Sequence, residues 1–298
     1  MITTKQFLRV LTPVVLAALV YLLVPYFLIK APINQALANG ATLEWGDCWF
    51  STRWWRPVYC GWFTTAESTD NSYQLPVVYI PYVGWDRESD PILYLNGGPG
   101  SSAYIDKDNI GYWWQWIDDV SARRDWLIYE QRGTGISPTA LTCVDLHPLY
   151  RQSLTERSYQ ADYLLSVQQQ LVDCFDDVIA AGYQIDFLNT HYNAKDALDL
   201  MQALVLDMPI SQWNLYGISY GSRLALEIMR LQPQYLRSVV LDGVYPPQVN
   251  GFLTWPKIAE DTFSRLDAWC MENVTCRNEN AFFMQRLEKL LPRLRNEP

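Results

Sequence analysis

The sequence predicts an α/β fold in which a mostly parallel sheet is flanked by helices. Three observations lead to this prediction. Short apolar runs of strand length recur along the chain, longer segments with apolar residues at helical spacing lie between them, and three of the short runs end in glycine-rich turns. Strands that alternate with helices are typical of parallel sheets.

The expected elements follow one another in a regular order. Strands are expected at residues 58–64, 75–83, 91–95 and 126–130, directly before Gly217, and at 238–242. Helices are expected at 110–120, 163–181 and 195–207, and again from Pro246 onward. The helix at 163–181 has Leu164, Leu171 and Phe175 at helical spacing, and Gly182 marks its end. The tryptophans within 110–120 are expected to pack in the core.

A strand that passes through Gly-x-Ser-x-Gly into a helix predicts a nucleophilic serine. Leu215 and Tyr216 precede the turn Gly217-Ile218-Ser219-Tyr220-Gly221, and the apolar face of a helix follows it. Such a turn strains the serine backbone, and it needs glycines two residues away on either side so that strand and helix can pass closely. The alternative is a glycine-flanked serine in an ordinary turn between a strand and a helix.

A second glycine-rich turn, Asn96-Gly97-Gly98-Pro99-Gly100, follows the strand at 91–95. In serine hydrolases with this arrangement, the loop after the third strand donates one backbone N–H to the oxyanion hole, and the residue after the nucleophile donates the other. Gly98, with Gly97 as its alternative, and Tyr220 are therefore the expected donors. A phosphate-binding loop is the other interpretation, but no lysine stands at the spacing it requires.

A third turn, Glu130-Gln131-Arg132-Gly133-Thr134-Gly135-Ile136-Ser137, follows the strand at 126–130. Together the three segments resemble the proline iminopeptidase and tripeptidyl aminopeptidase group of α/β-hydrolases. That group carries His-Gly-Gly-Pro-Gly, Asp-Gln-Arg-Gly-x-Gly-x-Ser and Gly-x-Ser-x-Gly. Asn96 therefore stands in place of the histidine, and Glu130 in place of the aspartate. The resemblance extends from Cys48 to Cys276.

The resemblance implies an α/β-hydrolase fold with a helical cap and the activity of a serine exopeptidase. Ser219 would attack a peptide carbonyl, with the N–H groups of Gly98 and Tyr220 holding the oxyanion. A carboxylate of the cap would bind the ammonium group of the substrate, and the candidates are Glu260, Asp261 and Glu272. No cofactor and no metal are implied. The other hypotheses are an esterase on the same scaffold and an inactive membrane-anchored remnant.

The partners of the serine are not found where the fold requires them. The expected chain order is serine, acid, histidine, yet no histidine follows Ser219, and His147 and His191 precede it. Both are expected to be ordinary solvated or helix-start histidines. Asp242 is a poor candidate for the acid, because the matching turn lies one strand too early. The last two strands of the expected sheet are also missing, so the strand that ends at Asp242 would form an uncovered edge. The sequence therefore predicts the N-terminal part of a longer hydrolase. The alternatives are a truncated gene product, a fragment, or one half of a split enzyme that a C-terminal chain would complement.

Composition and length set further bounds. The chain has 298 residues, of which 49% are hydrophobic and 18% charged, as in globular proteins. Its net charge of −9 argues against nucleic acid as a partner. We expect residues 1–30 to be a membrane anchor or signal segment, 31–57 a lead-in, 58–245 the hydrolase core, and 246–298 the start of the cap.

The N-terminal segment predicts export. Lys5 and Arg9 precede an apolar run from Val10 to Ile29, which is long enough to span a bilayer. The positive charges should keep the N-terminus in the cytoplasm and place the body in the periplasm or outside the cell. A signal peptide cleaved near Ala36-Leu37-Ala38, which would give a secreted protein, is the alternative.

Six cysteines fit an exported protein, because disulfides persist in oxidising compartments. The sequence alone allows fifteen pairings. We favour the three that link neighbouring segments, namely Cys48 with Cys60, Cys143 with Cys174, and Cys270 with Cys276. Buried free thiols are the alternative. A zinc site is not favoured, because the sequence has no Cys-x-x-Cys and only two histidines.

Overall fold

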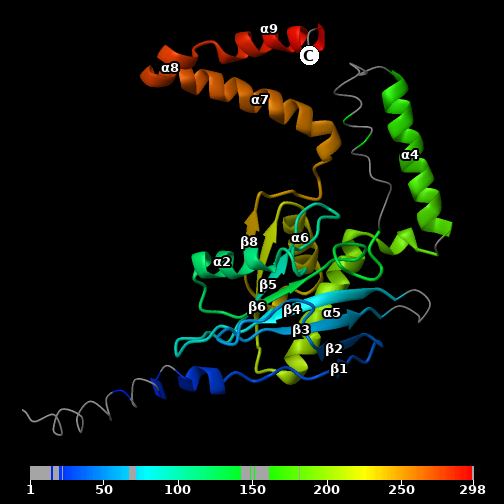
Figure 1. Ribbon diagram of the computed structural model, residues 1–298, viewed down its shortest axis with the longest axis vertical. Coiled ribbons are helices and arrows are strands. Elements are labelled where there is room, and N and C mark those ends of the chain that lie inside the picture. Colours follow the sequence, from blue (N-terminus) through cyan, green and yellow to red (C-terminus); the bar gives the residue numbers. More distant parts are fainter. Residues whose placement is uncertain are drawn as a thin grey trace, which may run out of the picture. The chain divides into compact units, whose positions relative to one another are not determined.

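The computed structural model describes residues 23–66, 72–141, 161–180 and 182–296, together with residues 15, 20, 21, 148 and 151. Its centre is an eight-stranded sheet with the strand order β1-β2-β3-β4-β6-β5-β7-β8 (Figure 1). The strands are β1 (Gln35–Ala36), β2 (Thr42–Gly46), β3 (Tyr59–Thr64), β4 (Gln74–Ile80), β5 (Ile92–Leu95), β6 (Trp126–Tyr129), β7 (Trp213–Ile218) and β8 (Leu236–Asp242).

The sheet is mixed rather than mostly parallel. Strands β6, β5, β7 and β8 pair in parallel, as the alternation of strands and helices predicts. Strands β1 to β4 pair antiparallel, and β4 joins β6 antiparallel. The connections from β1 to β2 and from β3 to β4 contain fewer residues than the roughly dozen that a parallel crossover needs. The α/β class is thus confirmed, with an antiparallel half that the alternation of elements did not predict.

Strands β1 and β2 lie in the segment at residues 31–57, which we expected to be a lead-in without assigning strands to it. They form a hairpin in which the Leu37 N–H donates to the Ala41 carbonyl at 2.8 Å. Gly40 has a φ of 95°, which only glycine adopts readily. Asn39-Gly40 between strands is a strong hairpin signal, and it was available in the sequence.

Helices cover both faces of the sheet and enclose two separate cores. On one face, α2 (Ile110–Val120) buries Trp113 and Trp114 against β5 and β6, which confirms the predicted role of the tryptophans. On the other face, α5 (Thr190–Asp207) and α6 (Tyr220–Leu231) bury Leu200, Leu224 and Ile228 against the sheet. Helix α6 follows β7 directly, so this second core fixes the turn between them.

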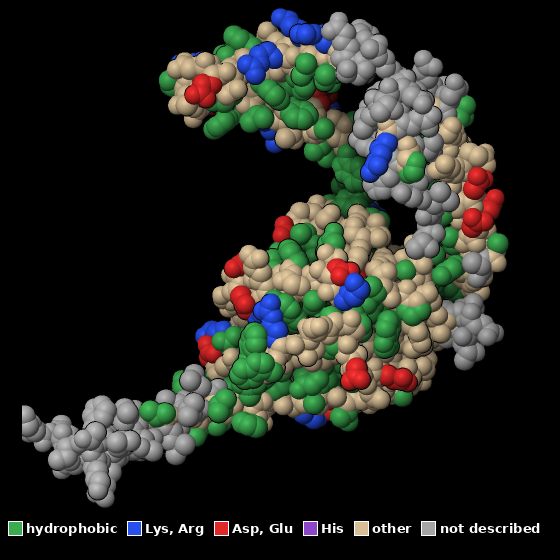
Figure 2. Space-filling model, in the orientation of Figure 1, with side chains coloured by type: hydrophobic (Ala, Val, Ile, Leu, Met, Phe, Trp, Pro, Cys, Tyr) green, Lys and Arg blue, Asp and Glu red, His purple; other side chains and the backbone are tan. Residues whose placement is uncertain are grey.

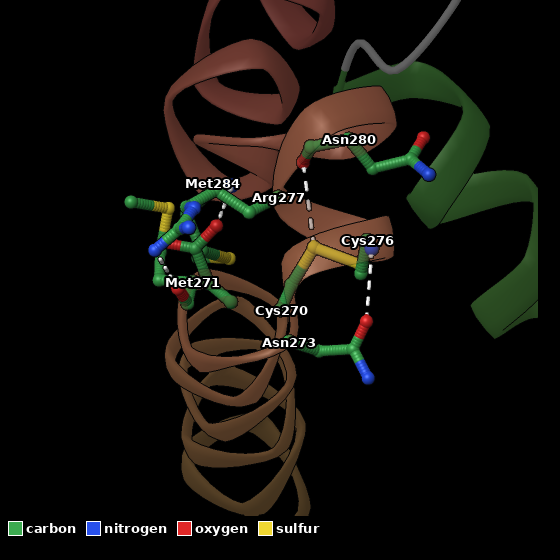
Figure 3. Close-up of a disulfide and its surroundings, with 8 residues drawn as sticks. Cys270, Met271, Asn273, Cys276, Arg277, Asn280 and Met284 are labelled. Atoms are coloured by element: carbon green, nitrogen blue, oxygen red, sulfur yellow. Dashed lines mark hydrogen bonds between the residues drawn. A yellow bond between two sulfur atoms is a disulfide. The ribbon is translucent and has the colours of Figure 1, made fainter.

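The chain divides into two compact units, residues 1–141 with 184–246 and residues 142–183 with 247–298. The first unit contains the sheet. The second contains α4 (Ala161–Ala180), α7 (Gly251–Glu272), α8 (Val274–Asn280) and α9 (Phe283–Asn296). Within it, the predicted disulfide between Cys270 and Cys276 closes the turn from α7 to α8, where Asn273 accepts a hydrogen bond from the Cys276 N–H at 3.0 Å (Figure 3).

The predicted disulfide between Cys48 and Cys60 is also present and ties the end of β2 to β3. Cys174 is disulfide-bonded as well. Cys143 and His147 lie outside the described residues, as does most of the apolar run from Val10 to Ile29. Among the helices of the described part, none combines the length and the apolar character needed to cross a membrane.

Candidate functional site

Ser219 occupies a strained turn between β7 and α6. Its φ of 54° and ψ of −117° lie in a region that residues other than glycine rarely adopt. Such a conformation costs about 1–3 kcal/mol and persists only where the surroundings enforce it. Here the Ser219 N–H donates to the Asp242 carbonyl at 2.7 Å, and the Ser222 N–H donates to the Ser219 carbonyl at 3.0 Å. Both sides of the serine are therefore held by backbone hydrogen bonds.

The two glycines of the turn are needed for space. A Cβ at Gly221 would lie 1.9 Å from the carbonyl oxygen of Leu95 in β5. A Cβ at Gly217 would lie 2.4 Å from the carbonyl oxygen of Gly221. These are backbone atoms that cannot move aside. The close passage of strand and helix that the sequence predicts is therefore observed, and it brings the end of β5 against the start of α6.

The loop after β5 approaches the serine through Gly97. A Cβ at Gly97 would lie 3.2 Å from Ser219 Cβ and 3.8 Å from Ser219 Oγ. Gly98 has a φ of 115° and faces its own loop, because a Cβ there would lie 2.7 Å from the Gly100 nitrogen. Of the two glycines, Gly97 is thus the one that lies next to the serine, and it was the alternative to Gly98 as the expected donor. That Gly98 supplies an oxyanion N–H stays a prediction.

Tyr220, the other expected donor, is the first residue of α6. The first four N–H groups of a helix have no acceptor within the helix, so the Tyr220 N–H is available to an oxyanion beside Ser219. Its side chain is buried, and its hydroxyl lies 3.0 Å from Thr190 Oγ1 at the start of α5. This contact with a second helix anchors the residue whose backbone faces the site.

Asn96 holds the shape of the loop after β5. Its side-chain amide donates to the carbonyls of Ser101 and Ser102 at 2.9 and 2.8 Å. Its oxygen accepts from the Tyr94 hydroxyl at 3.1 Å. Gln131 donates to the Asn96 carbonyl at 2.9 Å. The residue that replaces the usual histidine therefore closes the loop around Gly97.

Glu130 holds the far end of the same loop. Its carboxylate is fully buried and accepts hydrogen bonds from Ser102 Oγ at 2.8 Å, from the Ala103 N–H at 2.9 Å and from Thr134 Oγ1 at 2.9 Å. Burial raises its pKa, although the three donors act in the opposite direction. A Cβ at Gly135 would lie 2.1 Å from the Glu130 carboxylate, so only glycine fits there. Glu130 and Gly135 therefore have structural roles.

Arg132 forms a buried ion pair behind the site. Its guanidinium contacts Asp196 of α5 through two hydrogen bonds of 2.5 and 2.6 Å, and both side chains are almost completely buried. The rings of Tyr73 and Tyr192 lie within 4.9 and 5.1 Å of the guanidinium carbon. The ion pair thus connects the turn after β6 to α5. Among the described residues, Arg132 makes no direct contact with Ser219.

These features fit the comparisons with known proteins. A family model described as alpha/beta hydrolase fold matches residues 90–284, which is more than half of the chain. The chain belongs to the α/β-hydrolase fold family. The match contains the Gly97 loop, the Glu130 segment and the Ser219 turn.

Several individual proteins are similar to this α/β hydrolase. The tripeptidyl aminopeptidase of Streptomyces lividans is 26% identical over 233 residues, which cover 73% of this chain and 41% of that protein. YuaR of Escherichia coli strain K12 is 24% identical over 283 residues, covering 86% of this chain and 53% of that protein. The chain thus spans about half the length, or less, of these relatives.

Solved structures match at a lower level. The proline iminopeptidase-related protein of Thermus thermophilus is 18% identical, with a TM-score of 0.36, and the match covers 64% of this chain and 44% of that chain. The fold assignment therefore depends on the family model and on the sheet described above.

His191, the histidine that lies within the described residues of this α/β hydrolase, is distant from Ser219. His191 is in the first turn of α5, and its Nδ1 is 3.0 Å from the Glu227 carboxylate. Glu227 stands eight residues after Ser219 along α6, which corresponds to about 12 Å of helix. Hydrogen bonding between His191 and Ser219 is thus not supported, as expected for a helix-start histidine.

The carboxylates considered as the catalytic acid or as the group that binds the substrate ammonium have other surroundings. Asp242 accepts a hydrogen bond from the Tyr216 hydroxyl at 2.7 Å, and burial together with this bond raises the pKa of Tyr216 to about 12. In the second unit, Lys257 forms ion pairs with both Glu260 and Asp261; Lys257 and Glu260 are largely exposed, and Asp261 is half-buried. Glu272 is exposed at the end of α7.

Proposed function

We propose that this chain provides the nucleophile half of a serine hydrolase that acts on peptide N-termini. The observation that carries the proposal is the strained Ser219 backbone, held between Asp242 and Ser222, with Gly97 in contact. A turn of this kind exposes the serine hydroxyl next to the backbone N–H groups of the oxyanion hole. The similarity to tripeptidyl aminopeptidases supports peptides as the substrate class.

The proposed reaction starts with attack of Ser219 Oγ on the peptide carbonyl. The serine proton must pass to a general base, because a neutral hydroxyl is a weak nucleophile. The N–H of Tyr220 and one from the Gly97–Gly98 pair would stabilise the oxyanion, a contribution of about 3–4 kcal/mol per donor in related sites. Collapse of the intermediate releases the new N-terminus of the shortened peptide and leaves the acyl group on Ser219 until water removes it.

The general base is proposed to come from a C-terminal segment or chain that packs on β8. Strand β8 is at the end of the sheet and pairs only with β7 in the described part of the chain. Its residues are mostly exposed or half-buried, including Val240 at 49%. No histidine follows Ser219 in the sequence. A complementing segment would cover these side chains and bring the acid and the base.

The experiment compares this chain alone with this chain plus the polypeptide encoded directly downstream of it. We expect weak labelling of the chain alone by a fluorophosphonate probe, and strong labelling with tripeptide release from peptide N-termini once the second part is added. Ser219→Ala should abolish both activities, and Ser211→Ala, at an exposed loop serine, should leave them unchanged. Full turnover by the chain alone would contradict the proposal that this chain lacks the general base.

Substrate panels separate the remaining hypotheses. Hydrolysis of p-nitrophenyl acetate without release of peptides would favour the esterase alternative. Absence of labelling and of turnover, in complemented protein that folds, would favour the inactive remnant. In either case the aminopeptidase proposal is wrong.

We also propose that the body of the protein is exported and anchored by the N-terminal run. The disulfides at Cys48–Cys60 and Cys270–Cys276 support an oxidising compartment. In spheroplasts of a bacterial host, added protease should degrade the body while a cytoplasmic marker survives. Protection of the whole body would contradict export.

A further inference from the structure

A tight turn at residues 53–56 presents two tryptophans to solvent. The Arg56 N–H donates to the Arg53 carbonyl at 3.0 Å and closes the turn, with Trp54 and Trp55 at its tip. Trp54 is 88% exposed and Trp55 is 51% exposed. Tryptophan is among the side chains most buried on average. Two adjacent exposed indoles between two arginines therefore suggest a surface that meets a partner.

A cavity of about 430 Å³ opens beside this turn. The C-terminal end of α2, the residues after β4 and the start of β6 form its other walls. Its charged lining residues are Arg53, Arg56, Arg124 and Asp118. Figure 2 shows hydrophobic and basic side chains next to one another on the lower left of this unit, with acidic ones among them.

The arginines of the cavity are not equivalent. Arg56 forms an ion pair with Asp118, and Arg124 contacts Asp90 with an Nε–Oδ2 distance of 3.0 Å. Arg53 forms no ion pair with any described residue, and its guanidinium carbon lies 5.9 Å from the centre of the Trp55 ring. One guanidinium at the mouth of the cavity is therefore available to an anion.

A buried donor in the wall of the cavity also lacks an acceptor. Trp126, which is 1% exposed, lines the cavity, and its indole Nε1 has no hydrogen-bond partner within the described structure. An unsatisfied buried donor costs about 1–3 kcal/mol. The Nε1 atom is shielded from solvent, so it is Arg53 that favours a ligand, and its charge favours a negative one. A phosphate group carries this charge.

One described residue of the apolar N-terminal run, Tyr21, contacts the segment that follows the cavity residues. Tyr21 stacks on Trp85 with 5.6 Å between ring centres, and Trp85 Nε1 donates to the Tyr21 carbonyl at 2.8 Å. Trp85 follows the cavity residue Val83 by two positions and is itself 51% exposed. The exposed tryptophans thus lie on the same unit as the segment whose sequence favours lipid, and one of them contacts it.

We propose that the turn at residues 53–56 and its cavity dock on the surface of a lipid bilayer that contains anionic lipids. Trp54 and Trp55 would enter the interface, where tryptophan is enriched because its ring is apolar and its N–H is polar. A headgroup phosphate would lie in the cavity next to Arg53. Basic residues close to anionic membranes gain about 1 kcal/mol each. This surface has no part in the proposed catalysis.

The test uses the full chain reconstituted into vesicles of phosphatidylcholine, with or without phosphatidylglycerol. An environment-sensitive fluorophore is attached to Ser51→Cys, next to the turn, or to Gln202→Cys on α5, which covers the other face of the sheet. We expect the probe at residue 51 to be quenched by spin-labelled lipid, more strongly with phosphatidylglycerol, and the probe at residue 202 to stay unquenched.

Variants of the turn decide whether it makes the contact. Arg53→Gln should reduce the phosphatidylglycerol-dependent quenching about fivefold, since one charge near the membrane is lost. Trp54→Ser should reduce quenching in both kinds of vesicle. Equal quenching of both probes, or no effect of either substitution, would overturn the proposal. Saturation of the cavity by inorganic phosphate, with no quenching by lipid, would instead assign it to a soluble phosphate compound and also overturn docking.

Discussion

Replacement of Gly135 by alanine should destabilise this protein more than the same replacement at Gly133, another glycine with a positive φ. Gly135 has a φ of 60°, and an added Cβ would lie 2.1 Å from Glu130 Cδ and Oε1. Ordinary contacts of this kind are longer than 3 Å. The carboxylate would therefore have to move by about 1 Å, which is enough to break a hydrogen bond of normal length.

The cost can be estimated from two contributions. A residue with a Cβ in the left-handed region costs about 1–2 kcal/mol. Glu130 accepts hydrogen bonds from Ser102, Ala103 and Thr134, and each bond to a charged group contributes about 1.5–3 kcal/mol. Loss of one such bond brings the total to roughly 3–5 kcal/mol, a large fraction of the stability of a typical domain.

Urea denaturation of matched variants provides the measurement. Gly133→Ala is the control, because Gly133 also has a positive φ, of 74°, but an added Cβ would meet only flexible side chains, Leu141 at 3.3 Å and Leu188 at 3.6 Å. We expect Gly135→Ala to cost at least about 2 kcal/mol more than the control, the share of the lost hydrogen bond. Equal effects of the two substitutions would refute the reasoning.

A second variant tests the mechanism directly. Glu130→Asp shortens the side chain by one carbon–carbon bond, about 1.5 Å, and draws the carboxylate away from residue 135. The double variant with Gly135→Ala should then lose less stability than the sum of the two single variants, by about 1–3 kcal/mol. Simple additivity would show that the carboxylate is not the obstacle.

Three further predictions concern stability. Asp196→Asn leaves Arg132 buried without its carboxylate and should lower the free energy of unfolding by about 3–5 kcal/mol, measured by urea titration. Because burial raises the pKa of Glu130 above its ordinary value of 4.5, the folded state binds its proton more tightly than the unfolded state. Its contribution to stability should therefore decline as the pH rises from 4.5 through the folded pKa, and Glu130→Gln should remove this dependence in titrations at several pH values. A double serine variant that lacks the disulfide between Cys48 and Cys60 should lose about 3 kcal/mol of stability. The cost is expected to be no larger, because the loop that this disulfide closes is short, and a shift in the thermal midpoint would measure it.

The sequence predicts the parallel half of the sheet because each strand there is short, apolar and followed by glycines. The strand before Gly217 and the helix after it are local patterns, and the structure contains both. The antiparallel half was harder to foresee, since β1 and β2 have no continuous apolar run and their pairing depends on the turn at Asn39-Gly40. The alternation of strands and helices predicts a parallel sheet, but it contains no information about the antiparallel strands β1 to β4.

The candidate site was predictable only in part. The turn around Ser219 has a sequence signature, because it needs glycines at fixed positions. The approach of Gly97 rather than Gly98 depends on how the loop folds, and the donor list of Glu130 depends on contacts between residues distant in sequence. Such contacts have no local pattern. For the same reason, the sequence predicts only that Trp126 lies in a strand and not that its indole N–H lacks an acceptor.

The two departures from the family motifs act on the same loop. Asn96 donates to the carbonyls of Ser101 and Ser102, while Glu130 accepts from the hydroxyl of Ser102 and the N–H of Ala103. One side chain therefore satisfies the carbonyls of the loop and the other satisfies its donors. Because Glu130 is fully buried, its carboxylate must be compensated by these donors or become protonated. The asparagine and the glutamate are thus best understood as one hydrogen-bonded unit that sets the position of Gly97 beside Ser219.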